Sequence, residues 1–355
     1  MGPRIRADLA GVPGYVPGRT VEGAIKLASN EVSAGPLPSV MNAISRAGSV
    51  VNRYPDNGAA ELIDRLAARF DVGRDQVAVG CGSVALCHQL VQITCHDGDE
   101  VLFPWRSFEI YPIASQVTGA KPTMIPLTEE ARLDVDALLA AVSPATRLMF
   151  VCTPNNPTGP ALRGDELTRI IENTPPETLL VIDEAYREFV ADPEVPDGIE
   201  VAKKAWAQGR SNVAVLRTFS KAYGLAGLRV GFCVGSEPVV EALRKVYVPF
   251  GVNSLAQVAA IASLDAEDEL LARCRDIVAE RVRVRDALLE MGYRVPDSQA
   301  NFVWLPMGER TAEFNEHCLD HKVVVRAFVP EGVRVTVGEP AENDAFLAAA
   351  RAFKL

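Results

Sequence analysis

Short apolar runs alternate with amphipathic stretches through the middle of the chain, from about residue 76 to residue 235. The runs contain few polar residues, which is typical of strands buried on both faces of a sheet. Strands are expected at residues 76–80, 100–104, 121–125, 147–152, 178–183 and 211–218. Helices are expected between them, at residues 83–94, 108–118, 134–142 and 165–172. This alternation predicts an α/β fold with a mostly parallel sheet between layers of helices.

The pattern changes after residue 249. Residues 253–291 form one long stretch rich in Ala, Leu, Arg and Glu, with a helical period. Strand-like runs follow at residues 293–296, 301–306, 323–326 and 333–338, before a helix at 343–353. This mixture predicts a smaller α+β domain, which the irregular N-terminal segment joins. We therefore expect a large domain at residues 37–248 and a small domain made of residues 1–36 and 249–355.

Composition narrows the class of protein. The chain has 355 residues, 48% of them hydrophobic, which is enough for a sizeable core. Its net charge of −10 argues against a nucleic-acid or anionic-membrane partner. There is no apolar leader and no run of 18 apolar residues, and the seven cysteines contain no CxxC pair, so we expect a cytoplasmic protein with reduced thiols. His317 and His321 are four residues apart but no third ligand lies nearby, so no metal site is expected.

Polar motifs follow several of the expected strands at their carboxyl ends, where α/β sheets bind ligands. These motifs are GCGS (80–83), TPNNPTG (153–159), DEAY (183–186) and TFSK (218–221). Each alone is a weak signal, because a glycine turn is usually a tight connection and a Ser-Lys pair is usually at the surface. Together they supply a phosphate-binding turn at a helix start, an aspartate and a lysine. Pyridoxal phosphate needs that combination: a Schiff-base lysine, a carboxylate for its pyridine nitrogen and a phosphate site.

These motifs resemble those of the fold-type I pyridoxal-phosphate aminotransferases of the histidinol-phosphate/aromatic group. Within that family the sequence is most similar to the actinobacterial aromatic amino-acid (phenylalanine) aminotransferases. The matching motifs are KLASNE (26–31), NRYPDNG (52–58), VGCGS (79–83), WRSFEIYP (105–112), PNNPTG (154–159), IDEAYREF (182–189), TFSKAYGLAGLRVG (218–231), SQANFVWLP (298–306) and VRVTVG (333–338). The resemblance implies the fold-type I fold, with a large domain and a smaller α+β domain.

The resemblance also assigns the cofactor-binding residues. Lys221 would form the Schiff base with pyridoxal phosphate and then move the proton at the substrate Cα. Asp183 would keep the pyridine nitrogen protonated, and Phe108 would stack on the ring. Tyr186 and Asn156 would hydrogen-bond the 3-oxygen of the ring. The phosphate-binding residues that the resemblance implies are Gly82, Ser83, Ser220 and Arg229.

Further residues are implied for the substrate and for a second subunit. Arg334 would bind the substrate α-carboxylate as a bidentate fork, and Asn30 would lie near the substrate. Tyr54 would reach the phosphate site of a neighbouring subunit, which implies a homodimer. Tyr15 and Arg326 are candidates for the side-chain pocket, and either could equally be an ordinary surface residue.

The reaction expected from the resemblance is transamination between an aromatic amino acid, phenylalanine foremost, and a 2-oxo acid such as 2-oxoglutarate. Histidinol-phosphate transamination and a pyridoxal-phosphate-dependent decarboxylation remain alternatives, because both use the same cofactor residues. The histidinol-phosphate branch commonly has NENPYGP where this chain has NEVSAGP (30–36), and the run from Arg326 to Arg334 is short beside that branch. Both differences favour the aromatic donor. A non-enzymatic scaffold is disfavoured because Lys221, Asp183 and Arg334 are all present.

Overall fold

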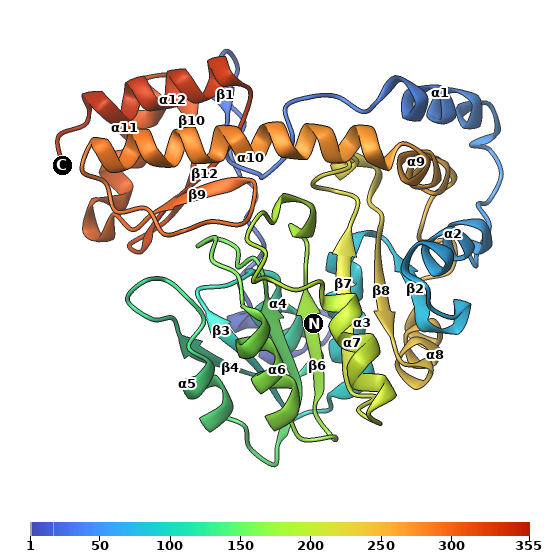
Figure 1. Ribbon diagram of the computed structural model, residues 1–355. Coiled ribbons are helices and arrows are strands. Elements are labelled where there is room, and N and C mark those ends of the chain that lie inside the picture. Colours follow the sequence, from blue (N-terminus) through green and yellow to red (C-terminus); the bar gives the residue numbers. More distant parts are fainter. Residues whose placement is uncertain (1, 17) are drawn as a thin grey trace.

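The computed structural model describes residues 2–16 and 18–355, and its centre is a seven-stranded sheet (Figure 1). In spatial order, its strands are β2 (Val77–Gly80), β8 (Gly231–Gly235), β7 (Val213–Thr218), β6 (Leu179–Asp183), β5 (Thr146–Cys152), β3 (Glu100–Trp105) and β4 (Lys121–Pro126). Only β8 among these strands runs antiparallel, to both β2 and β7. The mostly parallel sheet is confirmed, whereas β8 was not expected. Its five residues begin and end with glycine, which gives the segment the composition of a turn.

Both faces of this sheet are covered by helices, because successive strand residues point to opposite faces. One face packs against the helices α2 (Ala60–Phe70), α5 (Val135–Ala140), α6 (Gly164–Asn173), α7 (Gly198–Ala207) and α9 (Ser254–Asp265). The other face packs against α3 (Gly82–Thr94), α4 (Ile110–Thr118) and α8 (Glu237–Val246). The sheet is therefore buried on both sides, and its strand ends are the places where polar side chains can reach a ligand.

Local sequence signals set several of the helix starts. Asp134 accepts a hydrogen bond from the N–H of Ala137 at 2.9 Å at the start of α5. Asp197 caps α7 and Asn253 caps α9 in the same manner. Proline occupies the first turn of α8, of α1 (Pro38–Ala47) and of α12 (Pro340–Ala352), where its missing N–H costs nothing.

The C-terminal part has a core of its own around a three-stranded antiparallel sheet. Its strands and remaining helices are β11 (Arg326–Phe328), β12 (Gly332–Thr336), β9 (Phe302–Leu305), α10 (Glu267–Glu290) and α11 (Thr311–Asp320), with α12. The N-terminal segment reaches this part, because β1 (Ile25–Lys26) pairs in parallel with β10 (Val323–Val324). The described residues also form short 3-10 helices: Ala7–Gly11, Gly48–Val50, Arg74–Gln76, Arg187–Phe189, Ala226–Leu228 and Gly308–Arg310.

The long helical stretch expected at residues 253–291 is two helices, α9 and α10, because the chain leaves the helical conformation at Ala266. Helix α9 packs into the core of the central sheet, whereas α10 runs across the molecule to the C-terminal helices (Figure 1). Residues 293–296 are not a strand. Tyr293 is instead buried in the C-terminal core, where its hydroxyl donates to the carbonyl of Ala350 at 2.7 Å. The expected domain limits stay a prediction.

No helix in residues 2–16 and 18–355 is both long enough and apolar enough to cross a membrane. Within the same ranges, no three His, Cys, Asp or Glu side chains gather as metal ligands. All seven cysteines are free thiols, and only Cys81 is exposed.

Candidate active site

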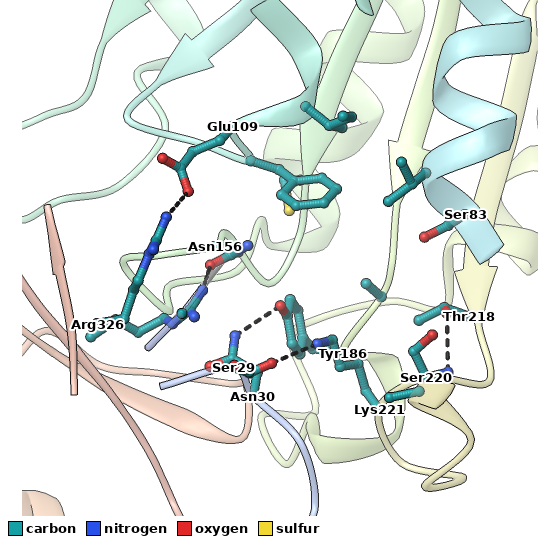
Figure 2. A pocket seen from close by; sticks show the side chains of 18 of the residues that line it. Ser29, Asn30, Ser83, Glu109, Asn156, Tyr186, Thr218, Ser220, Lys221 and Arg326 are labelled. Atoms are coloured by element: carbon teal, nitrogen blue, oxygen red, sulfur yellow. Dashed lines mark hydrogen bonds and ion pairs between the residues drawn. The ribbon is translucent and has the colours of Figure 1, made fainter. Parts of the chain in front are cut away.

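A cavity of about 410 Å³ lies at the carboxyl ends of β5, β6 and β7, where they face β11 and β12. This volume is in the range of small-molecule sites, roughly 300–1,000 Å³. The residues expected in the site that line it are Tyr15, Asn30, Ser83, Phe108, Asn156, Asp183, Tyr186, Ser220, Lys221, Arg229, Arg326 and Arg334. Figure 2 shows Ser83, Thr218 and Ser220 on one side of the cavity and Glu109 with Arg326 on the opposite side.

Lys221 follows β7 by three residues and is partly buried in the cavity wall. Its Nζ donates to the carbonyl oxygen of Ser29 at 3.0 Å, and no carboxylate of the described residues pairs with it. Burial, together with the nearby guanidinium groups of Arg334 and Arg229, lowers the pKa of Lys221 to about 7. A large fraction of this amine is therefore neutral at pH 7, and a neutral amine can act as a nucleophile or a base.

Asp183 ends β6 and is buried beside the cavity. The Tyr111 hydroxyl donates to its Oδ2 at 2.7 Å, and the N–H of Ala185 donates to its Oδ1 at 3.2 Å. Burial raises the pKa of Asp183 to about 6, although the hydrogen bond from Tyr111 opposes the shift. Within the described ranges no cation pairs with this carboxylate, and a buried charge without a partner is costly. The geometry therefore fits a ligand that brings a protonated nitrogen to Asp183.

A candidate anion site lies at the start of α3, next to β2. Helix α3 begins at Gly82 without a side-chain cap, so its first N–H groups are available to a ligand. Arg229 donates to the Ser220 hydroxyl at 3.3 Å, and Ser83 lines the same end of the cavity. Gly82 has φ +74°, and a Cβ there would collide with the guanidinium of Arg229. Glycine at this position thus lets a guanidinium lie against a helix start, an arrangement that suits a phosphate.

Arg334 brings a second cation to the cavity, from β12. It is buried and donates to Asn156 Oδ1 and, at 2.6 Å, to the carbonyl of Ala28. Its Nε is buried and has no hydrogen-bond partner among the residues that the structure describes. Burial lowers the pKa of Arg334, because its charge is removed from water without an acidic partner. This guanidinium can therefore accept a carboxylate.

Tyr186 lies between the two sides of the cavity (Figure 2). Its hydroxyl accepts a hydrogen bond from Asn30 Nδ2 at 2.9 Å. Asn30 is held in turn by Thr336 of β12, because its N–H donates to the Thr336 hydroxyl at 2.9 Å. Burial raises the pKa of Tyr186, so this side chain stays a phenol at neutral pH. The N-terminal segment is thus part of the site wall, as expected for Asn30.

Two expected residues do not line the cavity. Gly82 is the first residue of α3 and directly precedes Ser83, which does line the cavity. Tyr54 is 82% exposed, and its ring stacks on Phe250 with centroids 4.5 Å apart. Tyr111 and Glu109 were missed by the sequence analysis, although both lie in the quoted motif WRSFEIYP. Tyr111 is three residues after Phe108, a spacing that could have suggested it, whereas nothing local indicates the partner of Glu109.

Residues 22–349 match the family model described as aminotransferase class I and II. The chain belongs to the class I and II aminotransferase family. The expected reaction class, amino-group transfer by an enzyme, is thereby confirmed.

Individual relatives of this aminotransferase cover its whole length. It is 56% identical over 354 residues to the aromatic amino acid aminotransferase of Mycobacteroides abscessus, with 100% of both chains covered. It is also 56% identical over 348 residues to the aromatic amino acid aminotransferase of Rhodococcus jostii, with 98% of this chain and 95% of that one covered. Among solved structures, histidinol-phosphate aminotransferase from Sinorhizobium meliloti, in complex with pyridoxal-5'-phosphate, has a TM-score of 0.89 at 27% identity and covers 99% of this chain and 97% of its own. The expected fold-type I architecture is confirmed.

Proposed function

We propose that this aminotransferase uses pyridoxal phosphate to transfer the amino group of an aromatic amino acid, phenylalanine foremost, to a 2-oxo acid such as 2-oxoglutarate. One observation carries the proposal. Lys221 follows β7 and Asp183 ends the adjacent strand β6; both line one cavity next to a candidate phosphate site, and both lack a counter-ion among the described residues. A ligand with an aldehyde, a protonatable ring nitrogen and a phosphate satisfies all three features together.

The proposed cofactor contacts follow from the positions of the side chains. Lys221 would bind the aldehyde carbon, Asp183 the ring nitrogen, and Phe108 the ring face. Tyr186 and Asn156 would bind the 3-oxygen. The phosphate would be bound by the start of α3 at Gly82 with Ser83, Ser220 and Arg229. When bound, pyridoxal phosphate supplies an electron sink for the electron pair left behind when the substrate Cα loses its proton.

The residues of this chain would position the substrate and move its proton. Arg334 would bind the α-carboxylate, because its guanidinium has no acidic partner among the described residues. The substrate amino group would displace Lys221 from the aldehyde carbon, and the freed Lys221 amine, whose pKa is lowered to about 7, would take the proton from Cα. The donor would leave as a 2-oxo acid before the acceptor binds, so the same residues would serve both halves of a ping-pong exchange.

The side-chain end of the cavity supports an aromatic donor. Phe328 lines the cavity beside Arg326, with its ring centre 5.3 Å from that guanidinium, and can pack against a substrate ring. Arg326 lies at this end, but its charge is offset by Glu109, which accepts its hydrogen bond at 2.9 Å. A phosphate-bearing side chain, as in histidinol phosphate, would meet this neutralised pair. The aromatic amino acid aminotransferases that are 56% identical to the chain support the same choice.

We also propose a homodimer in which Tyr54 reaches the phosphate site of the second subunit. Tyr54 is exposed and stacks on Phe250, and the apolar side chains of Val50, Val51 and Val248, which lie close to these two residues in the sequence, are exposed as well. Exposed apolar side chains of this kind are typical of an interaction surface. The variant Tyr54→Ala should weaken pyridoxal phosphate binding without changing the cavity of its own subunit, as measured by equilibrium dialysis. Sedimentation equilibrium would show whether the wild type is a dimer.

The test of the function follows the absorbance of bound pyridoxal phosphate in the purified protein. Phenylalanine is added to one sample and histidinol phosphate to another, with no acceptor present. We expect a fast change with phenylalanine and its absence in Lys221→Ala. A fast change only with histidinol phosphate would reverse the substrate assignment. Release of carbon dioxide, detected by product analysis, would indicate a decarboxylase. Failure of the wild type to bind the cofactor would overturn the proposal.

A further inference from the structure

Two ion pairs connect the segment after β3 to the hairpin formed by β11 and β12. In one pair the arginine lies in the segment after β3, and in the other pair it lies in the hairpin. Arg106 Nη2 donates to Glu331 Oε1 at 2.8 Å, and Arg326 Nη2 donates to Glu109 Oε2 at 2.9 Å. Their places differ, because Glu109 and Arg326 line the cavity whereas Arg106 and Glu331 do not. Figure 2 shows the Glu109–Arg326 pair at the end of the cavity away from Ser83.

The hairpin presents two arginines side by side. Arg326 of β11 is the register partner of Arg334 of β12, and directly opposite residues project from the same face of an antiparallel pair. Arg334 has no acidic partner among residues 2–16 and 18–355, while Arg326 has Glu109. The Arg326 side chain is only 13% exposed, and its guanidinium lies 5.3 Å from the ring centre of Phe328, so it is held in place. Of the two arginines that the hairpin presents to the cavity, only Arg334 therefore keeps an uncompensated positive charge.

We propose that Glu109 is a specificity-determining residue, which neutralises Arg326 and so makes the cavity favour substrates with an uncharged side chain. The proposal rests on the proposed function, in which Arg334 binds the α-carboxylate. An aromatic ring can occupy this end and leave the ion pair intact. A side-chain carboxylate or phosphate must instead displace Glu109 from Arg326, which leaves a partly buried carboxylate without its partner. An acidic 2-oxo acid is accepted against that cost.

The main alternative is that the pair only fastens the hairpin to the rest of the molecule. The Arg106–Glu331 pair provides the matched control, since it joins the same two segments outside the cavity. The variants Glu109→Gln and Glu331→Gln each remove one negative charge and keep the size of the side chain. A fastening role predicts similar effects of the two substitutions on ligand binding, whereas a specificity role predicts an effect of Glu109→Gln alone.

The experiment measures, by calorimetry, how tightly the cofactor-loaded protein binds two carboxylic acids. Neither acid has an amino or an oxo group, so neither can undergo transamination. Glutarate and 3-phenylpropanoate each present one carboxylate to Arg334 on the same two-methylene stem and differ at the far end, which is a carboxymethyl group in glutarate and a phenyl ring in 3-phenylpropanoate. We expect Glu109→Gln to bind glutarate at least about tenfold more tightly, because a charge-assisted hydrogen bond to Arg326 becomes available without displacement. The affinity for 3-phenylpropanoate should change much less, and Glu331→Gln should keep the wild-type ratio of the two affinities.

A reciprocal variant makes the outcome decisive. Arg326→Gln should bind glutarate more weakly than the wild type, because Glu109 then repels the second carboxylate. The double variant Glu109→Gln/Arg326→Gln should lose the gain seen in Glu109→Gln. The proposal is overturned if Glu109→Gln shifts the affinity ratio no more than Glu331→Gln does, or if the gain persists without Arg326. Failure of the wild type to bind pyridoxal phosphate or to respond to phenylalanine would instead overturn the proposed function.

Discussion

Asp183 and Glu184 are consecutive carboxylates at the end of β6, and they lie in opposite environments. Asp183 faces the cavity and, among residues 2–16 and 18–355, its carboxylate accepts hydrogen bonds only from Tyr111 and the Ala185 N–H. Glu184 accepts from Arg217 Nη2 at 2.7 Å and from the N–H of Gly198 at 2.8 Å. Arg217 also donates to Asp197 at 2.8 Å. Glu184, Arg217 and Asp197 therefore form an ion-pair network behind the strand, in which opposite charges compensate one another.

The difference separates structural charge from charge kept for a ligand. Burial alone would lower the pKa of Arg217, but Glu184 and Asp197 raise it above its ordinary value. Burial raises the pKa of both Asp183 and Glu184, and only Glu184 has a guanidinium that opposes the shift. A compensated buried charge holds the fold together, whereas an uncompensated one beside a cavity is stable only in the presence of a suitable ligand.

The largest expected effect is a loss of stability when the ion-pair network behind β6 is broken. Replacing Arg217 by Met keeps an unbranched apolar stem but leaves Glu184 buried without its cation. We expect the free energy of unfolding to fall by about 3–5 kcal/mol, the usual result of removing one partner of a buried ion pair. Chemical denaturation of the wild type and the variant measures this loss. The double variant Arg217→Met/Glu184→Gln should recover part of it; equal losses in the two variants would mean that the ion pair is not the cause.

A substitution on the cavity side of β6 should lower the activity of the enzyme. We expect Asp183→Asn to lower kcat/KM with phenylalanine by at least about a hundredfold, because a preorganised charge beside the reacting group is lost. Glu184→Gln is the matched control at the neighbouring residue, and its effect on kcat/KM at equal folded fraction should be far smaller. Equal losses of activity in the two variants would remove the distinction between the two faces of the strand.

The same substitution has a pH signature in the cofactor-free protein. The pKa of Asp183 is about 6 in the folded state against an ordinary value of 3.8, so the folded state binds this proton more tightly than the unfolded state. The wild type therefore loses stability from this group as pH rises from about 4 to 6. The Asp183→Asn variant has no carboxyl group at this position, so it does not lose this contribution to stability. Its free energy of unfolding relative to the wild type should therefore rise between about pH 4 and 6 and stay higher at pH 7. Denaturation at pH 4 and pH 7 tests the sign.

The side of the site formed by the sheet could be predicted from sequence, because each element is contiguous. A buried strand followed by DEAY or TFSK places Asp183 and Lys221 at the edge of a parallel sheet by topology alone. The paired partners could not be predicted in that way. Glu109 meets Arg326 across 217 positions of the sequence, and Tyr111 meets Asp183 across 72. Such contacts depend on how layers of the fold are packed together, and a single sequence carries no pattern that records them.

The elements of the fold also divide into those that the sequence predicts and those that it does not. The apolar strands buried on both faces were recognisable, whereas β8 and the break between α9 and α10 were not. Ala266, where that break lies, is a good helix former, so only the packing of α9 against the central sheet ends the helix there. Tyr54 is a further case, because it is exposed within one chain and its proposed role depends on a second subunit.

Tyr111 provides the finest test of the comparison, because it is the one side chain of the described residues that donates to Asp183. Tyr111→Phe should keep the stacking on Phe150, whose ring centre lies 4.4 Å away, and remove only the hydroxyl. The pKa of Asp183 should then rise further, since the lost hydrogen bond favoured its charged form. We expect a loss of about 1.5–3 kcal/mol in the free energy of unfolding at pH 7, typical of a hydrogen bond to a charged group.

A double-variant cycle shows whether this loss acts through Asp183. If it does, Tyr111→Phe should cost much less stability in the Asp183→Asn background than in the wild type, because the charged acceptor is already absent. Strictly additive losses would mean that the hydroxyl contributes through packing alone. In that case the Asp183 carboxylate would be held by the backbone N–H of Ala185. Its contrast with Glu184 would be greater still, because no side chain of the described residues would then stabilise the charge of Asp183.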